Sequence, residues 1–262
     1  MAPLPHRGSA RRPSGFVTCI ALVALSLGAR AALAEDLTVS AAASLTNAFK
    51  EIGAAFEAAN PGTKVQLNFG ASGALLQQIA RGAPVDVYAS ADEETMDQAE
   101  QQQLVTRQTR VDFASNSLVV VVPADAATPP KSLDELRSAA YKRIAIGLPA
   151  SVPAGRYAKA ALEKAQLWPV LEAKMVGAQS VRQALDYVGR GEVEAGFVYA
   201  TDAALMSGRV KVAFSVPTAT PVRYPIAVLS ASGNADAAAR FVAYVVSPPA
   251  QAVLARHGFA KP

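Results

Sequence analysis

Cysteine and histidine are almost absent from this chain of 262 residues. The sequence has one cysteine, Cys19, and two histidines, His6 and His257. Cys19 and His6 both lie in an N-terminal segment that we expect to be removed, so the mature chain would hold no cysteine and one histidine. Structural disulfides and zinc sites of the Cys/His type are therefore excluded from it.

Familiar catalytic motifs are missing as well. Neither a GxxxxGK[ST] phosphate loop nor a GxSxG nucleophile turn occurs. A Ser-His-Asp triad would depend on His257, which precedes Gly258 and has the position of a helix C-terminal residue. No cluster of carboxylates resembles a metal site. We therefore expect no enzymatic activity and no resident cofactor.

Long apolar runs are absent apart from one near the N-terminus. Three arginines precede an apolar run over residues 16–28, and Ala32, Leu33 and Ala34 then form the small-x-small pattern of a signal-peptidase site. A membrane-spanning helix needs about 20 apolar residues, so a cleaved signal peptide is favoured over an anchor. We predict a signal peptide over residues 1–34, cleavage after Ala34, and a periplasmic protein.

The net charge of +4 comes from the segment that cleavage would remove. This segment holds four arginines and no acidic residue, so its loss lowers the Lys+Arg count from 25 to 21, equal to the 21 Asp+Glu. A neutral mature chain gives no electrostatic reason to expect nucleic acid or a membrane surface as a partner.

Short apolar runs alternate with amphipathic segments from residue 37 onward. The predicted strands are residues 37–39, 65–69, 85–89, 118–122, 144–147, 174–176, 195–199, 210–214 and 226–229. Helical patterns of period 3.6 follow most of these runs. The alternation predicts an α/β protein with largely parallel sheets that helices cover.

Two segments are positions where the chain can pass between two lobes. One lies near residues 112–117, and the other lies over residues 217–224, within a stretch over residues 217–225 that carries three prolines. They would make lobe 1 discontinuous, from residues 35–114 plus 222–262, with lobe 2 inserted as residues 115–221. The cleft between two lobes is a favoured place for a ligand.

A junction of small residues recurs where an apolar run ends and a helix begins. Four such junctions contain Ser44, Ser72, Ala154 and Val181. Helix starts leave backbone N–H groups without partners and carry partial positive charge, so several together can hold an oxyanion. Each junction alone is equally consistent with an ordinary turn, and only convergence in space would make a site.

Five segments resemble the bacterial molybdate-binding proteins of ABC importers, in order and over nearly the whole mature chain. They are AAASLTNAF, FGASGALLQQIARGAPVDVYASAD, NSLVVVVP, VPAGRYAKAAL and SVRQALDYVGRGEVEAGFVYATDA. The resemblance implies a two-lobed periplasmic-binding-protein fold of type II, in which each lobe is a sheet flanked by helices and the ligand lies between them. It also implies a monomer that passes molybdate or tungstate to the permease subunits of an ABC transporter.

The resemblance implies five ligand-binding residues. Ser44 and Ser72 would donate their hydroxyls, Ala154 and Val181 their backbone N–H groups, and Tyr199 its phenol. A tetrahedral dianion offers only acceptors, so every contact must be a donor, and all five groups are donors. Molybdenum would then be present only within the bound oxyanion. Relatives often carry a run of serines where this chain reads Gly-Ala-Ser-Gly at the second junction, so backbone donors there are expected to be placed differently.

Other conspicuous residues are expected to have structural roles. Arg156 is expected to be a solvated helix residue, and Asp92 and Asp202 to be helix caps. Asp86, within an apolar strand, is expected to fasten a neighbouring helix or turn, and Tyr88 to lie in the core or at a sheet edge.

Three alternative functions stay open. The same fold could bind another oxyanion such as sulfate or phosphate, although the proton of hydrogen phosphate favours a carboxylate acceptor that these junctions lack. A ferric-ion binder would use clustered tyrosines and carboxylates, whereas Tyr199 has no adjacent tyrosine. A secreted serine hydrolase could use Ser44 or Ser72, but it lacks a well-placed base.

Overall fold

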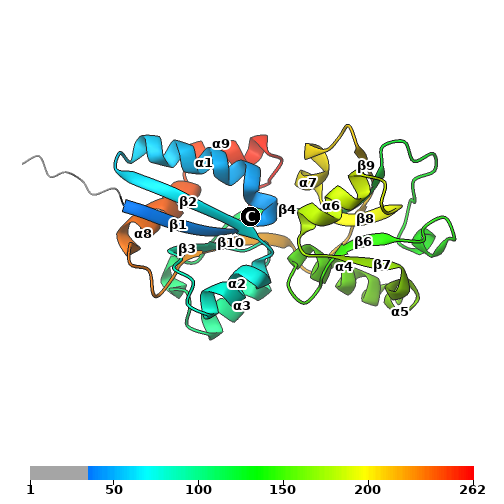
Figure 1. The fold of residues 1–262 in the computed structure, drawn as a ribbon, viewed down its shortest axis with the longest axis horizontal. Helices are drawn as coiled ribbons and strands as arrows, with labels where there is room; N and C mark the ends of the chain where they lie inside the picture. The colour runs from blue at the N-terminus through cyan, green and yellow to red at the C-terminus, as the bar shows by residue number, and fades with distance from the viewer. Residues whose placement is uncertain (1–34) are drawn as a thin grey trace, which may run out of the picture. The chain divides into compact units, whose positions relative to one another are not determined.

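The computed structural model describes residues 35–262, so the predicted signal peptide lies outside the described residues. Two five-stranded sheets form the body of the protein (Figure 1). The first contains β1 (Glu35–Ala42), β2 (Thr63–Gly70), β3 (Val87–Ala89), β4 (Val111–Asn116) and β10 (Val222–Val228). The second contains β5 (Leu118–Pro123), β6 (Ile144–Gly147), β7 (Met175–Ala178), β8 (Ala195–Tyr199) and β9 (Val210–Val216).

Both sheets are mixed. Their strand orders are β2-β1-β3-β10-β4 and β7-β6-β8-β5-β9. In the first, β1 runs parallel to β2 and β3, while β10 runs antiparallel to β3 and β4. In the second, β6 runs parallel to β7 and β8, while β5 runs antiparallel to β8 and β9.

The chain passes between the sheets twice, at Ser117 and over residues 217–221. We call residues 35–116 with 222–262 lobe 1, and residues 118–216 lobe 2, according to the sheet that each part builds. Strand β4 continues to Asn116, past the expected limit of lobe 1 at residue 114.

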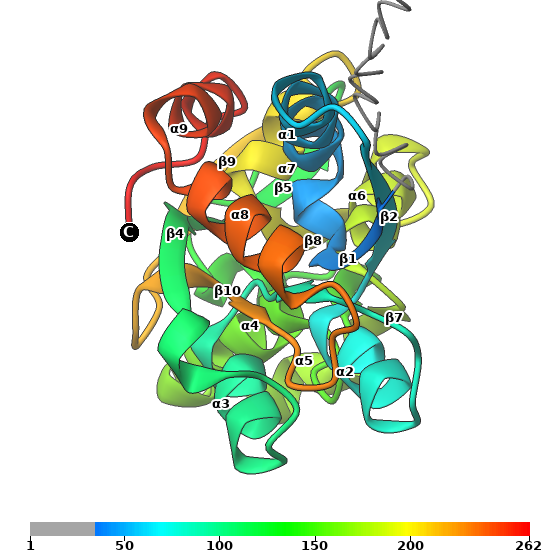
Figure 2. The ribbon, with the colours of Figure 1, turned by 90° about the vertical axis from the view of Figure 1, so that its left-hand side faces the viewer.

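Helices cover both faces of each sheet (Figures 1 and 2). In lobe 1, three helices pack against one another on one face and two on the other: α1 (Thr46–Ala59), α8 (Ala235–Val245) and α9 (Pro248–Arg256), then α2 (Ser72–Ala80) and α3 (Glu93–Gln101). In lobe 2 the two groups are α6 (Val181–Gly189) with α7 (Ala200–Leu205), and α4 (Pro153–Lys164) with α5 (Trp168–Leu171). Short 3₁₀ turns are η1 (Ala43–Leu45), η2 (Arg107–Thr109), η3 (Asp134–Arg137) and η4 (Glu172–Lys174). Within residues 35–262 no helix has the length and apolarity that a membrane span requires.

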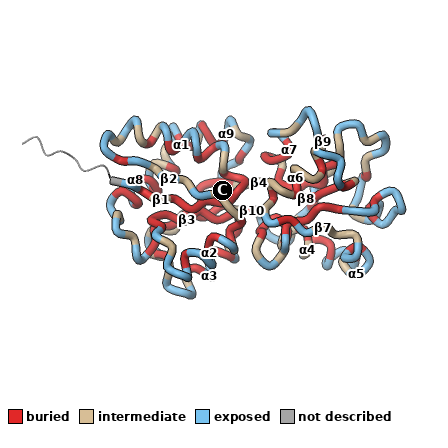
Figure 3. The backbone as a smooth tube through the Cα atoms, in the orientation of Figure 1, coloured by how far each residue is buried: buried red, intermediate tan, exposed pale blue. Residues whose placement is uncertain are grey.

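Burial follows the strands of both sheets (Figure 3). The predicted strand at residues 118–122 is buried along its whole length in β5, as a β-branched run covered on both faces should be. In lobe 1, Phe49 and Phe56 lie two turns apart on α1 and meet Phe241 of α8, with ring centroids at 6.2 and 5.2 Å. This edge-to-face aromatic packing holds α1 against α8.

Strand β10 begins earlier than the sequence suggests. The predicted strand started at residue 226, whereas β10 starts at Val222 and includes Pro225. Pro225 lacks an N–H group, and the ladder accommodates it because the register with β4 shifts between Tyr224 and Pro225. Part of the expected connection is therefore a strand of lobe 1.

Asp86 has the fastening role expected of it. Its carboxylate accepts the N–H of Thr38 at 2.8 Å and the hydroxyl of Ser232 at 2.7 Å. These bonds hold the turn that precedes α8 against β1.

Candidate functional site

A small cavity lies where the strand ends of the two lobes meet. The volume open to a water-sized sphere is about 10 Å³, which is far below the range of about 300–1,000 Å³ for drug-sized ligands and is room for about one water molecule. The lining residues are Ala42, Ala43, Ser44, Gly70, Ala71, Ser72, Ala91, Val152, Pro153, Ala154, Val181 and Tyr199. All five residues that the sequence singled out line it, and each is at most 4% exposed. We call this space the binding cavity.

Three helices begin at the binding cavity. Ser72 is the first residue of α2, Val181 is the first of α6, and Ala154 follows Pro153 at the start of α4. First-turn N–H groups have no partner within their own helix. Among the described residues, no carbonyl outside the helices accepts from the amides of these three residues. Three positive helix ends with free donors therefore face one space.

Close backbone approach shapes the α4 end of the cavity. A Cβ atom on Gly155 would lie 1.8 Å from the carbonyl oxygen of Gly147, the last residue of β6. Only glycine permits this contact. The first turn of α4 can therefore pack directly against the end of β6, beside the cavity.

The Ser72 hydroxyl is held by a protein donor. Its Oγ accepts the backbone N–H of Ala91 at 3.0 Å, and its carbonyl accepts the Tyr88 hydroxyl at 2.8 Å. A backbone N–H can only donate, so the hydroxyl proton of Ser72 stays free for a ligand. Tyr88 thus has the core role that was expected.

Among residues 35–262, the Ser44 hydroxyl has one hydrogen-bonding partner, Tyr224. Ser44 lies in η1, directly before α1, and its Oγ is 3.1 Å from the Tyr224 hydroxyl oxygen. Tyr224 does not line the binding cavity, yet it touches a residue that does. Sequence analysis missed it because the stretch before residue 226 was interpreted as a connection.

The side chain of Tyr199, in lobe 2, reaches across to lobe 1. Its hydroxyl donates to the carbonyl oxygen of Ala91 at 3.3 Å, a long and therefore weak hydrogen bond that a ligand can replace. Burial, reinforced by the nearby Tyr224 phenol, raises the pKa of Tyr199 well above that of a free tyrosine, so the phenol keeps its proton. Ala91 was also missed, although Ala89-Ser90-Ala91 before the helix-capping Asp92 repeats the small-residue pattern of the other junctions.

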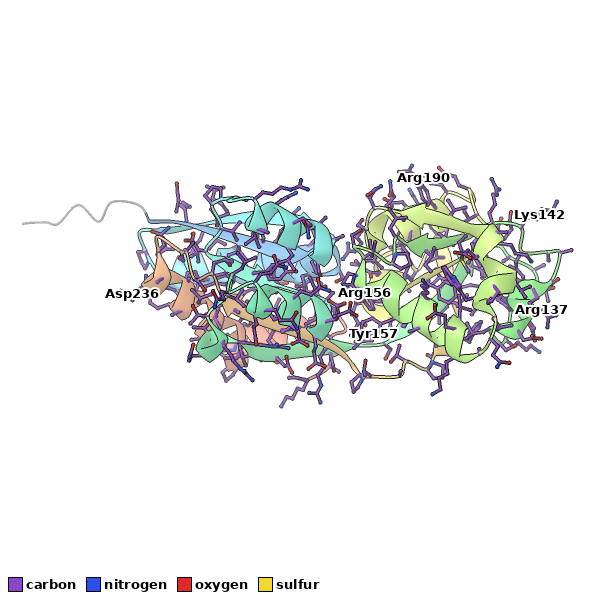
Figure 4. All side chains as sticks on the ribbon, turned by 90° about the horizontal axis from the view of Figure 1, so that it is seen from below. Arg137, Lys142, Arg156, Tyr157, Arg190 and Asp236 are labelled. Carbon is purple, nitrogen blue, oxygen red and sulfur yellow. The ribbon has the colours of Figure 1, made fainter. Side chains whose placement is uncertain are left out.

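None of the lining residues carries a charged side chain, and Asp92, which follows the lining residue Ala91, is paired with an arginine. The guanidinium of Arg156 contacts Asp92 Oδ2 through Nη2 at 2.7 Å and Nε at 2.9 Å. Figure 4 shows Arg156 and Tyr157 where the two lobes meet. The expectation of a solvated Arg156 is wrong, because its side chain is 17% exposed and joins lobe 2 to lobe 1. Asp92 caps α3 as predicted, accepting the N–H of Thr95.

A second arginine joins the lobes on the other side. Arg182 of α6 donates to Asn47 Oδ1 at 3.0 Å and to the Ser44 carbonyl at 3.1 Å, and its Nε lies 2.5 Å from Asp202 Oδ1. Asp202 is therefore an ion-pair partner and not the helix cap that was expected, since α7 has no side-chain cap. Burial raises the pKa of Asp202, and Arg182 opposes that shift.

The lobes also touch through their backbones. The N–H of Gly73 on α2 donates to the carbonyl of Ser151 in lobe 2 at 2.9 Å. Together with the two arginines, this bond holds the two lobes together around the binding cavity. Residues 35–262 contain no group of three or more histidine, cysteine, aspartate or glutamate residues suited to a metal ion.

Comparisons with known proteins agree with this architecture. The profile of the bacterial extracellular solute-binding protein family matches residues 37–260. The molybdate-binding protein ModA of Escherichia coli is 38% identical over 87% of this chain and 91% of its own length. The Haemophilus influenzae protein of the same name is 33% identical over 91% and 95%. The solved periplasmic molybdate-binding protein of Azotobacter vinelandii superposes with a TM-score of 0.75, at 25% identity, over 86% of this chain and 99% of that one.

Proposed function

The chain belongs to the bacterial extracellular solute-binding proteins, and we propose that it captures molybdate or tungstate and delivers it to an ABC transporter. One observation carries the proposal: a small cavity between the lobes is lined by hydroxyl and backbone donors and by no charged side chain. The relatives named for molybdate binding give the ligand class.

The donors of the binding cavity suit a fully deprotonated tetrahedral anion. The hydroxyls of Ser44, Ser72 and Tyr199 and the amides of Ala154 and Val181 can all donate. Hydrogen bonds to a charged group contribute about 1.5–3 kcal/mol each, so five of them offset a large desolvation cost. A neutral cavity also avoids a buried unpaired cation when it is empty.

Fixed donors also select by size. Molybdate and tungstate are larger than sulfate, so a cavity fitted to the larger anions would leave sulfate with stretched hydrogen bonds. The donors are fixed because they lie on helix starts and on buried side chains of both lobes.

Ligand binding and closure are one event in this proposal. An anion held by donors of both lobes stabilises the closed form relative to an open one. The closed monomer, secreted to the periplasm after cleavage at Ala34, then docks on the permease subunits of the transporter.

A secreted serine hydrolase is the weaker hypothesis. The hydroxyls of Ser44 and Ser72 have Tyr224 and Ala91 as partners, and His257 Nε2 lies 3.1 Å from Glu51 Oε2 on the surface of lobe 1. Within residues 35–262 no histidine or carboxylate is hydrogen-bonded to either serine, and we propose a binding protein without enzymatic activity. Turnover of a chromogenic ester that Ser44→Ala abolishes would reverse this assignment.

Isothermal titration of the mature chain with molybdate, tungstate, sulfate and phosphate tests the function. We expect heat with molybdate and tungstate, weaker binding in Ser44→Ala and in Tyr199→Phe, and unchanged binding in the control Tyr141→Phe. Tyr141 donates to the carbonyl of Thr128 in lobe 2 and does not line the binding cavity, so the control removes a comparable hydroxyl. A folded protein that gives no heat with any of these anions would defeat the proposal.

A further inference from the structure

Arg182 holds residues of both lobes with one guanidinium group. It is the second residue of α6, directly after the predicted ligand donor Val181. Its Nε donates to Asp202 Oδ1 in its own lobe, and in lobe 1 its Nη1 donates to Asn47 Oδ1 at 3.0 Å and its Nη2 to the Ser44 carbonyl at 3.1 Å. Arg182 does not line the binding cavity, so any effect on the anion must pass through its neighbours.

The ion pair with Asp202 keeps the guanidinium on lobe 2. The Asp202 side chain is fully buried, and among the described residues its Oδ2 has no hydrogen-bond partner. A buried carboxylate that loses its paired cation is strongly destabilising. Both residues belong to lobe 2, on the helices α6 and α7, which pack against each other. The ion pair therefore persists whether the lobes are together or apart.

The two bonds to lobe 1 exist only while the lobes are together. Asn47 lies in the first turn of α1, and Ser44 lies in η1 directly before that helix. The proposed function requires the lobes to part for the anion, and this motion leaves Nη1 and Nη2 of Arg182 to water. The Arg182 side chain is 24% exposed, so water can replace both acceptors without leaving a buried donor unpaired. The two bonds thus favour the closed form without preventing opening.

From this geometry we infer that Arg182 is a positioning residue for the anion: anchored on Asp202, it holds the Ser44 segment of lobe 1 against the start of α6 in the closed form. Ser44 and Val181 are predicted donors from opposite lobes, and Arg182 bonds the carbonyl of the first and directly follows the second. It thereby keeps both donors on one anion. The inference rests on the proposed function and adds a residue that slows release of the anion without touching it.

The experiment measures association and release of sodium molybdate by stopped-flow in the wild type, Arg182→Lys, Asn47→Ala and the double variant. Lysine keeps a positive charge for Asp202, but one ammonium group lacks the planar fork that holds Asn47 and Ser44 together. We expect release from Arg182→Lys to be about tenfold faster at an unchanged association rate, the effect of about one hydrogen bond to a charged group. Asn47→Ala removes one of the two bonds and should speed release about threefold.

The double variant separates this role from a general structural one. Asn47 acts through Arg182, so adding Asn47→Ala to Arg182→Lys should cause no further acceleration. The matched control is Arg190→Lys, which alters an exposed ion pair with Glu192 at the other end of α6 and should leave the release rate unchanged. Thermal melting without ligand checks that each variant is folded.

The possible results are distinct. Unchanged release in folded Arg182→Lys, a slower association in place of a faster release, or additive effects in the double variant overturns the inference. Asn47→Ala leaves the ion pair between Arg182 and Asp202 intact, so an unchanged release rate in this variant overturns the inference even if Arg182→Lys folds poorly. A folded wild type that gives no heat with molybdate in isothermal titration overturns the proposed function instead.

Discussion

Replacing Gly73 by alanine should weaken anion binding without weakening the fold. A Cβ atom there would lie 2.9 Å from both Cα and O of Ser151 in the opposite lobe, whereas ordinary contacts begin at 3.4 Å. These are backbone atoms, so no side chain can swing away, and the lobes must part by about half an ångström at this point.

The magnitude follows from the bonds that this displacement disturbs. The bond from Gly73 N–H to the Ser151 carbonyl is stretched beyond its present 2.9 Å and weakened, at up to about 1 kcal/mol. At least one hydrogen bond to the anion is stretched, at about 1.5–3 kcal/mol, because the donors come from both lobes. A total of about 3 kcal/mol lowers the affinity for molybdate roughly a hundredfold.

The free energy of unfolding of the ligand-free protein should rise slightly. Gly73 is helical and alanine is favoured over glycine within a helix by about 0.5–1 kcal/mol, so the open, ligand-free form gains slightly. Thermal melting without ligand and isothermal titration with molybdate separate the two effects. The matched control is Gly53→Ala on α1, where the nearest atoms to a Cβ lie at 3.5 Å. Wild-type affinity in Gly73→Ala would refute the reasoning, and so would a large loss of stability without ligand.

Three further predictions test other parts of the structure. Arg156→Gln removes the partly shielded ion pair to Asp92, so we expect anion release, measured by stopped-flow, to become about tenfold faster and to depend less on salt concentration. An unchanged release rate would contradict this role. The control is Arg137→Gln, which removes an exposed ion pair. The pKa of Tyr199 is raised, so its donor persists as pH rises, and affinity should stay level from about pH 7 to about pH 9; a decline over that range would show that a titrating group holds the anion. Gly155→Ala forces a Cβ atom against the Gly147 carbonyl and should lower the free energy of unfolding by more than about 3 kcal/mol, measured by urea denaturation; a wild-type unfolding curve would disprove the contact.

The alternation of strands and helices was readable from the sequence because hydrophobic periodicity is local. The buried run of β5 and the helix starts at Ser72 and Val181 lie where the pattern placed them. The strand β10 was shortened in the prediction, because prolines usually interrupt strands and the bulge that admits Pro225 depends on the partner strand β4.

The donors of the binding cavity were predictable from the sequence, but their convergence in space was not. The five predicted residues meet there, and their roles as ligands remain a prediction. Arg156 was misjudged because Asp92 is 64 positions away, and a single sequence shows no such pairing. Tyr224 was missed for the same reason, since Ser44 lies 180 positions from it. Long-range partners of this kind are set by the tertiary fold.

The crossing at Ser117 limits how the protein can move. One residue separates β4 from β5, and its carbonyl is itself tied to the N–H of Ala200 at the start of α7. A connection this short favours a hinge rotation of one lobe relative to the other over a sliding motion. In the proposed function, this short tether returns the donors to the same positions whenever the lobes close, and separation of the lobes releases the anion.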